Sequence, residues 1–217
     1  MPIVFARCNM LYHIEENFLD PEIFDTIKKR APLYRKYARM EDDFVPINVE
    51  IDEEQGYYEK NVRRNRVWRT NHKTYIDKVD VSDTMIQFFG KEFIEPLDKA
   101  KQTFKNKGLA NITLKNMWLQ YADKQSAIHR HIDGPIFSAP IHKSFTALIW
   151  LHDYWDTSWG GELKMIIDGK TVTFDPKPNT FVAWTRDTVH WVTPINDKYN
   201  ESVHPTRTML GFSLYEY

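Results

Sequence analysis

Two histidines and an aspartate lie close together in the segment HRHIDGP, which covers residues 129–135. His131 and Asp133 are two residues apart, and residues at that spacing on a strand point to the same face. One more histidine would complete a two-histidine, one-carboxylate facial triad, which binds Fe(II) and leaves coordination positions open. The motif alone is weak, because such pairs often arise by chance and a hydrogen-bonded pair at the end of a strand is the plain alternative.

Two downstream histidines compete to be the third ligand. His190 begins a predicted strand after the apolar run at 181–184, whereas His204 lies in the loop-like segment 197–205. Arg207 is the candidate for binding an anion, because its guanidinium is planar and stays charged. It follows His204 by three residues, and an odd offset on a strand puts two side chains on opposite faces. We therefore prefer His190 as the ligand and interpret His204 as a solvated loop histidine.

The periodicity of the chain divides it into a helix-rich part and a strand-rich part. A helix is predicted over 20–38, and a second helical pattern begins near Ser82, is kinked or split by Pro96 and ends at Gly108. Strands are predicted over 112–122, 144–152, 161–167, 170–174, 180–185, 190–195 and 207–217, with a hairpin turn at 168–169. This order indicates an antiparallel sandwich or barrel with helices packed on one outer face.

Composition limits the class of protein. The 217 residues suffice for one domain with a sizeable core, and 42% hydrophobic with 27% charged residues is typical of a globular protein. A net charge of -1 gives no reason to expect a nucleic-acid or membrane partner. Cys8 is the only cysteine, the N-terminus lacks the apolar core of a signal peptide, and no apolar run reaches membrane-spanning length. We expect a cytoplasmic protein.

An ordered series of motifs carries a family resemblance over residues 112–217. In chain order these are Tyr121, His131-Ile132-Asp133, Thr146 to Leu151, Gly160-Gly161-Glu162-Leu163, Pro176, Val182-Ala183-Trp184, His190-Trp191-Val192-Thr193-Pro194 and Arg207. The series resembles the prolyl-4-hydroxylase-like branch of the 2-oxoglutarate/Fe(II)-dependent dioxygenase superfamily. The resemblance implies a mainly β fold with flanking helices, a double-stranded β-helix or distorted jelly roll with the N-terminal helices packed on one sheet.

The same resemblance implies roles for individual residues. His131, Asp133 and His190 would bind Fe(II), and Arg207 would pair with the distal carboxylate of 2-oxoglutarate. Tyr121 and Thr146 match positions that contact this cosubstrate. Trp150 stands where relatives often have a tyrosine, and its indole N–H can still donate a hydrogen bond to the cosubstrate. We expect residues 1–217 to form a single dioxygenase domain, with a helix-rich support region at 1–110 and a jelly-roll catalytic core at 111–217.

The expected function is that of an enzyme. The resemblance implies an Fe(II)- and 2-oxoglutarate-dependent oxygenase that uses O2 to hydroxylate an unactivated C–H bond and releases succinate and CO2. Peptidyl proline is the substrate class that the branch suggests, with other peptides or small molecules as alternatives. The competing hypothesis is a non-catalytic, cupin-like jelly-roll protein that binds a metal or another ligand.

The sequence allows more than one role for several other polar residues. His129 shares the strand face of His131, so a cupin-type pair is possible, although a supporting or exposed position fits better. His142 and His152 lie near predicted loops and are interpreted as structural or surface residues. The basic segment 61–70 is interpreted as a solvated charged stretch, with anion or nucleic-acid contact as the alternative. We expect substrate specificity to reside in 41–75 and 134–143.

Overall fold

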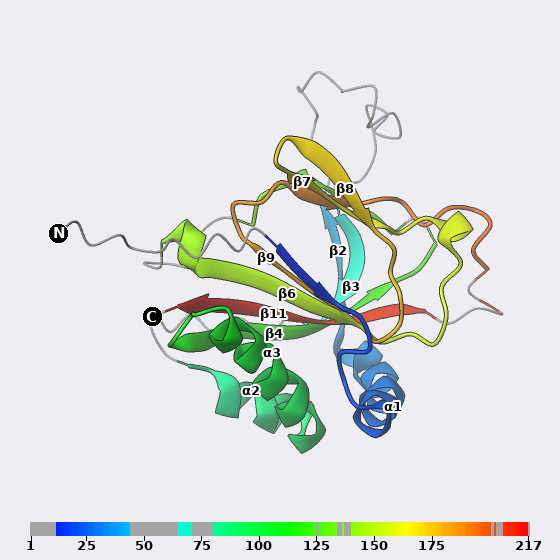
Figure 1. The fold of residues 1–217 in the computed structure, drawn as a ribbon. Helices are drawn as coiled ribbons and strands as arrows, with labels where there is room; N and C mark the ends of the chain where they lie inside the picture. The colour runs from blue at the N-terminus through cyan, green and yellow to red at the C-terminus, as the bar shows by residue number, and fades with distance from the viewer. Residues whose placement is uncertain are drawn as a thin grey trace.

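Antiparallel strands make up most of the protein (Figure 1). The computed structural model describes residues 12–43, 65–70, 80–124, 126–133, 136, 140–200, 202 and 206–216. The described strands are β1 (Tyr12–Glu15), β2 (Arg39–Asp43), β3 (Asn65–Arg69), β4 (Ile112–Ala122), β5 (Ile128–His131), β6 (Ser144–Trp150), β7 (Leu163–Ile167), β8 (Lys170–Phe174), β9 (Phe181–Thr185), β10 (His190–Val192) and β11 (Arg207–Glu216).

These strands form two antiparallel sheets. The larger has the order β1–β9–β6–β11–β4, and the smaller has the order β5–β10–β7–β8. Strand β3 pairs with both β4 and β5 and so links the sheets, while β2 pairs with β3. The path through the described strands runs open from β1 to β8. The predicted mainly β architecture is confirmed.

Alternate residues of the large sheet face two different environments. On β11, Leu210, Phe212 and Leu214 face outward and belong to the apolar core that the sheet shares with the helices. Met209 and Ser213 of the same strand line a cavity inside the molecule. This period of two follows from the pleat of a strand. One sheet therefore supports the helices with one face and the cavity with the other.

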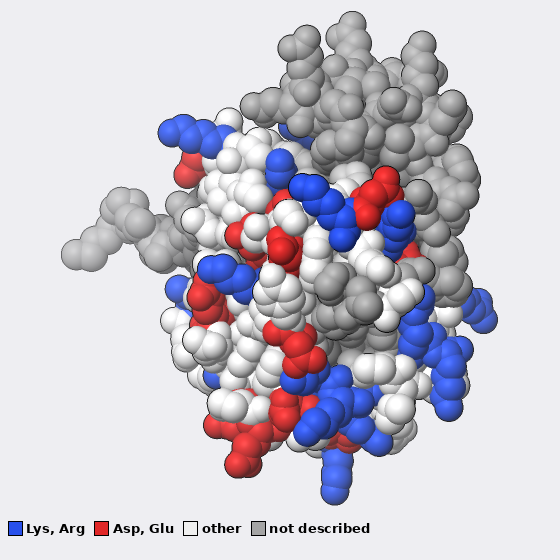
Figure 2. All heavy atoms as spheres, turned by 90° about the vertical axis from the view of Figure 1, so that its right-hand side faces the viewer, with Lys and Arg blue, Asp and Glu red and all other residues white. Residues whose placement is uncertain are grey.

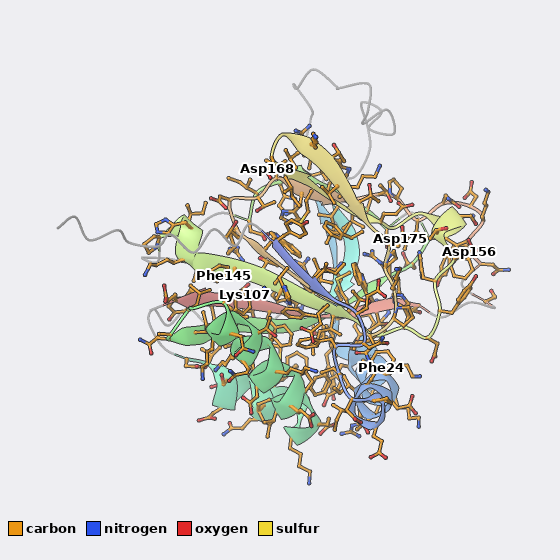
Figure 3. The ribbon with its side chains drawn as sticks, viewed as in Figure 1. Phe24, Lys107, Phe145, Asp156, Asp168 and Asp175 are labelled. Carbon is orange, nitrogen blue, oxygen red and sulfur yellow. The ribbon has the colours of Figure 1, made fainter. Side chains whose placement is uncertain are left out.

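The helices cover the outer face of this sheet (Figure 1). Figure 3 labels Phe145 on β6, and its ring lies 4.9 Å from that of Phe104 of α3, measured between centroids. The described helical elements are α1 (Pro21–Arg30), the 3-10 helix η1 (Ala31–Tyr37), α2 (Ser82–Phe89), the 3-10 turn η3 (Lys91–Phe93), α3 (Ile94–Asn106) and the 3-10 turns η4 (Ile141–Lys143) and η5 (Thr157–Trp159). The predicted packing of helices on one sheet agrees with this arrangement.

Two helix predictions need correction. The α-helix predicted over 20–38 ends at Arg30, because Pro32 has no N–H for the carbonyl of Lys28, and the chain continues as η1. The second helical pattern breaks at Gly90, which has φ of 101°, and not at Pro96. Pro96 lies in the first turn of α3, where a missing N–H is tolerated.

The turns between elements agree better with the sequence-based predictions. Gly108, after the end of α3, has φ of 88°, the left-handed conformation expected of a helix-terminating glycine. Asp168 and Gly169 have φ of 50° and 73° and join β7 to β8, with Ile167 paired to Lys170. Figure 3 labels Asp168 at the tip of this hairpin. The predicted hairpin turn is confirmed.

Two surface properties bear on partners. None of the described helices is long and apolar enough to cross a membrane. Acidic and basic side chains both occur across the face shown in Figure 2, in keeping with a net charge of -1.

Candidate metal centre

Backbone pairing brings the two histidines of the centre together. His131 is the last residue of β5, His190 is the first residue of β10, and the two are direct partners in the antiparallel pair. Their ring centroids are 4.3 Å apart. Asp133 follows β5 by two residues, and its backbone N–H donates to the carbonyl of Arg186 at 3.1 Å. Strand pairing and one loop contact therefore aim three side chains at one point.

The distances between these side chains suit a shared ion. Nε2 of His131 lies 3.6 Å from Oδ1 of Asp133, and Nε2 of His190 lies 3.8 Å from Oδ2. The three potential ligand atoms all lie within 4.8 Å of one another. Adjacent ligand atoms of an octahedral ion lie roughly 3 Å apart. The three groups fit a metal after a small inward movement, and the set of two imidazoles and one carboxylate is the one that non-haem Fe(II) oxygenases use.

The backbone sets the tautomer of both imidazoles. Nδ1 of His131 lies 2.7 Å from the carbonyl of His129, and Nδ1 of His190 lies 2.9 Å from the carbonyl of Thr188. A carbonyl oxygen only accepts hydrogen bonds, so each Nδ1 carries the proton and donates it. The lone pair on each Nε2 is then directed at the centre, as metal binding requires.

A hydrogen-bonded network holds Asp133. Thr146 on β6 donates its hydroxyl proton to Oδ2 of Asp133 at 2.6 Å. Arg186 donates from Nη1 to Oγ1 of Thr146 at 3.1 Å and to Oγ of Ser213 at 3.2 Å. Its Nη2 donates to the backbone carbonyl of Asp133 at 2.9 Å. Arg186 and Thr146 thereby fix the orientation of the carboxylate.

The protonation states favour metal binding. Burial alone would raise the pKa of Asp133, but its contacts with His131, His190, Arg186 and Thr146 outweigh burial and lower it. Burial lowers the pKa of His190, which the charge of Asp133 only partly offsets. The aspartate is therefore ionised and His190 is neutral, and these are the forms that bind a metal.

The triad opens into a cavity of about 190 Å³ between the two sheets. Its wall combines apolar side chains with several hydrogen-bond donors. The lining residues are Arg69, Asn116, Trp118, Gln120, Ile128, His131, Asp133, Thr146, Leu148, Leu163, Trp184, Arg186, His190, Val192, Arg207, Met209 and Ser213.

Arg207 lies at the start of β11 and is the most deeply buried of the cations in the wall. It is 1% exposed, and its Nε and Nη2 atoms have no hydrogen-bond partner among the described residues. Burial lowers its pKa to about 10, opposed by the charge of Glu162, so it stays protonated at neutral pH. A buried guanidinium with unpartnered donors is costly unless an anion binds it. A carboxylate in the cavity is the complement that this arrangement fits.

A close backbone approach lies next to Arg207. Gly160 has φ of 77°, and a Cβ on it would lie 2.2 Å from the carbonyl oxygen of Pro194. A Cβ on the adjacent Gly161 would lie 3.6 Å from Cδ of Arg207. Gly160 therefore serves packing, because a side chain there would collide with the backbone of Pro194.

Thr146, Tyr121 and Trp150 are the other residues expected to contact the cosubstrate, and they lie in three different environments. Thr146 lines the cavity, but its hydroxyl proton goes to Asp133. Tyr121 points to the opposite side of the sheet, where its hydroxyl donates to the carbonyl of Ala31 at 2.6 Å and lines a separate cavity of about 320 Å³. Trp150 is fully buried and packs in the core cluster that contains Leu163 and Met209. It is not among the residues that line the triad cavity.

Sequence reasoning missed several polar residues of the wall. Asn116 and Gln120 lie on the inner face of β4, beside the outward-facing Tyr121. Arg186 follows β9 and turns back to Asp133. Arg69 belongs to the basic segment interpreted as solvated, and the structure instead places it in the cavity wall. An arginine next to the apolar run 181–184 was the one local signal that could have drawn attention to Arg186.

The remaining histidines of the described segments lie outside the triad. His129 stacks on His131 at 5.0 Å between ring centroids and supports it through its carbonyl. His142 is exposed in η4. His152 is buried, its Nε2 donates to the carbonyl of Pro176, and burial lowers its pKa to about 4. His204 and the arginines at 63 and 64 lie outside the described residues.

The fold and the site together resemble those of the jelly-roll oxygenases with an open iron triad. Residues 117–210 match the model of the 2OG-Fe(II) oxygenase superfamily. This segment contains His131, Asp133, His190 and Arg207, and it is similar to that superfamily. No curated protein matches the chain at the level of sequence.

Solved structures of distant proteins share the fold. A prolyl hydroxylase from Trichoplax adhaerens, in complex with a hypoxia inducible factor oxygen degradation domain peptide fragment, is 16% identical with a TM-score of 0.61, over 95% of this chain and 84% of that one. The viral collagen prolyl hydroxylase of Paramecium Bursaria Chlorella virus-1 is 12% identical with a TM-score of 0.61, over 98% and 99%. The epimerase SnoN from nogalamycin biosynthesis is 13% identical with a TM-score of 0.62, over 95% and 78%.

These findings confirm three predictions. The jelly-roll fold is that of the neighbours. The match over residues 117–210 supports the resemblance to the 2-oxoglutarate/Fe(II) dioxygenase superfamily, and it supports an oxygenase enzyme. The family implies Fe(II) and 2-oxoglutarate as the groups that the site takes.

Proposed function

We propose that the protein hydroxylates an unactivated C–H bond with Fe(II) as cofactor and 2-oxoglutarate and O2 as cosubstrates, releasing succinate and CO2. The observation that carries the proposal is the convergence of His131, Asp133 and His190 on one cavity whose wall also holds the buried Arg207. When bound, the iron supplies the oxygen-activating chemistry that amino-acid side chains lack. The protein's own residues bind the metal and the cosubstrate, orient the cosubstrate and exclude water.

Each residue has a task that follows from its contacts. His131, Asp133 and His190 would hold the metal, and two imidazoles with one carboxylate are a ligand set that suits Fe(II) together with a chelating 2-oxo acid. Arg207 binds the distal carboxylate of the cosubstrate and so sets its direction in the cavity. The apolar side chains of the wall, among them Leu148 and Leu163, exclude water from the reacting groups.

The substrate proposal is a prolyl or other peptidyl residue. Two of the structural neighbours are prolyl hydroxylases, one of them with a bound peptide fragment. SnoN, an epimerase, has the same fold, so the fold alone does not fix the reaction. The cavity of about 190 Å³ has room for a small cosubstrate, which suits a larger substrate that binds at its mouth. The single cysteine supports our proposal of a reducing compartment, the cytoplasm.

Turnover tests this function against the alternative of a binding protein. We expect succinate formation from 2-oxoglutarate to require both Fe(II) and O2, to be stimulated by proline-containing peptides, and to add one oxygen atom to the peptide by mass spectrometry. His131→Ala should abolish succinate formation while the circular dichroism spectrum is unchanged. Tight metal binding by the wild-type protein without succinate formation would favour a cupin-like binding protein instead.

A further inference from the structure

Gln120 is a buried side chain whose two ends have different surroundings. It is 1% exposed and lies on the inner face of β4, in the wall of the triad cavity. Its Oε1 accepts two hydrogen bonds from Arg69, from Nε at 3.2 Å and from Nη2 at 2.7 Å. Its Nε2 has no hydrogen-bond partner among the described residues.

The fork of Arg69 determines which way the amide points. A guanidinium only donates hydrogen bonds, so the oxygen of Gln120 must face Arg69 and the NH2 group must face away from it. Burying an amide N–H without an acceptor is unfavourable, and the residue that carries this unpartnered donor lines the cavity. The arrangement is that of a donor prepared for a ligand.

Sheet register places this donor beside Arg207. In the β4–β11 pair, Gln120 is opposite Met209 and Arg207 is opposite Ala122. Gln120 and Arg207 are therefore diagonal neighbours across two adjacent strands, with Cα atoms roughly 7–8 Å apart. Long side chains at that spacing can reach one small group between them.

A carboxylate is the group that both donors fit. Its two oxygens offer about four lone-pair sites, more than a single guanidinium satisfies. Nε and Nη2 of Arg207 and Nε2 of Gln120 are all donors, and all are buried without a partner in the described part of the chain. The amide adds a donor to the site without adding charge.

We propose that Gln120 donates from Nε2 to the distal carboxylate of 2-oxoglutarate together with Arg207, and that Arg69 positions Gln120 for this contact. The inference rests on the proposed function. It assigns to Gln120 the place beside the cosubstrate that the sequence had suggested for Tyr121, whose hydroxyl is directed to the other side of the sheet.

The test compares two ligands that differ only at the proposed contact. 2-Oxopentanoate has a methyl group where 2-oxoglutarate has its distal carboxylate, and both chelate iron through the same 2-oxo acid end. Equilibrium binding to the Fe(II) protein is measured anaerobically by calorimetry for wild type and for Gln120→Leu. We expect Gln120→Leu to weaken 2-oxoglutarate by about ten- to a hundredfold, the loss typical of a hydrogen bond to a charged group, and to leave 2-oxopentanoate unchanged.

Two further variants keep this test decisive. Gln120→Glu has the same shape and can still accept from Arg69, so it should fold even where Gln120→Leu does not. Its negative charge should weaken 2-oxoglutarate far more than 2-oxopentanoate. Gln102→Leu makes the same chemical change on the exposed side of α3 and should affect neither ligand.

Arg69→Met tests the positioning role through a double-mutant cycle. If Arg69 acts through Gln120, the change should weaken 2-oxoglutarate several-fold in wild type and have little effect in Gln120→Leu. The same loss in both backgrounds would overturn the positioning role, because Arg69 would then act on the ligand independently.

The outcomes separate this inference from the proposed function. If wild type binds 2-oxoglutarate and Gln120→Leu binds it equally well, or loses both ligands to the same extent, the inference is wrong and the proposed function stands. If wild type binds neither 2-oxo acid in the presence of Fe(II), the proposed function itself fails.

Discussion

The two faces of the large sheet differ in whether their buried side chains find partners within the described part of the protein. The outer face presents apolar side chains such as Leu119, Ile149 and Phe212, which are buried against the helices and one another. The inner face carries the donors of Trp118, Gln120, Trp184 and Arg207, which have no hydrogen-bond partner among the described residues. Since buried polar groups are rarely left unpaired in a finished core, the outer face is built for stability and the inner face for a ligand.

The comparison has a simple origin in the strand pleat. Adjacent residues on β4, β6, β9 and β11 point to opposite faces of the sheet. One residue therefore contributes to the helix-facing core, and the next contributes to the cavity wall. If the two faces have separate roles, substitutions of the polar side chains on the inner face should change ligand binding, and substitutions of apolar side chains on the outer face should change the free energy of unfolding. The predictions below test that separation, from the largest expected effect to the smallest.

The largest effect is expected inside the cavity, at the metal. His131→Ala should reduce oxygenase activity to the uncatalysed background, because two remaining ligands do not hold the iron in its open geometry. The midpoint of thermal unfolding of the metal-free protein should change little, since His131 is a strand-end residue and only partly buried. Activity assays and thermal scans check this pair of results. A variant that unfolds at room temperature would instead assign His131 a structural role.

The next largest effect is expected on the outer face. Phe212→Ala removes a fully buried ring from the helix-facing core and should lower the free energy of unfolding by about 3–5 kcal/mol. Binding of Fe(II) and 2-oxoglutarate to the folded fraction should be retained. Denaturant titration followed by ligand binding measures both. Phe88→Ala is the matched control, and because Phe88 is 38% exposed, about 1 kcal/mol is expected.

Gly211 allows a test of the contact between neighbouring inner-face residues. A Cβ at this position would lie 2.2 Å from Cε2 of Trp118, whose indole lies across β11. Gly211→Ala should displace the indole, cost about 1–3 kcal/mol of stability and alter the fluorescence of the protein. Restored stability in the double variant with Trp118→Phe would support this explanation, and unchanged fluorescence in Gly211→Ala would contradict it.

Thr146 tests whether the network around Asp133 matters for the metal. Thr146→Val keeps the shape but removes the hydroxyl that donates to Oδ2 of Asp133. Iron affinity should fall by about ten- to a hundredfold, as is typical when a group that orients a metal ligand is lost. Thr146→Ser should restore most of the affinity. Equal affinities of the valine and serine variants would show that the hydroxyl has no such role.

The smallest effect is expected at the rim of the sheet, away from both faces. Glu216 accepts a hydrogen bond from Nζ of Lys143 at 2.8 Å, and this contact lowers its pKa. A folded-state pKa below the unfolded one stabilises the protein above the unfolded value of about 4.3, and the contribution is lost as pH falls through the folded pKa. Glu216→Gln should therefore cost about 0.2–1 kcal/mol at neutral pH, and the difference should vanish in acid. Urea titrations at the two pH values measure it.

Much of the fold was predictable, because its signals are local. The hairpin at Asp168-Gly169 and the glycine after α3 depend on backbone conformations that few residues adopt. The separation of helix-rich and strand-rich parts follows from hydrophobic periodicity. The short strands β2 and β3 went unpredicted, because strands of five residues carry too little pattern to recognise.

The site was predictable only where spacing within a strand is enough. His131 and Asp133 are two residues apart, and the structure brings His190 to them through one antiparallel pair. The face of Tyr121 was not predictable, because β4 is buried on both sides and its pairing with β11 shifts register near Lys115. Arg186 was missed because its contact with Asp133 joins residues 53 positions apart in the chain.

The most direct test of the central claim is an anaerobic titration of the metal-free protein with Fe(II) and then 2-oxoglutarate, followed by visible absorption. We predict a charge-transfer band from the chelated iron complex in wild type. The band should be absent in His131→Ala and should require more 2-oxoglutarate in Arg207→Ala. Folded wild-type protein that gives no band with both additions would contradict the oxygenase account and favour a jelly-roll protein that binds another ligand.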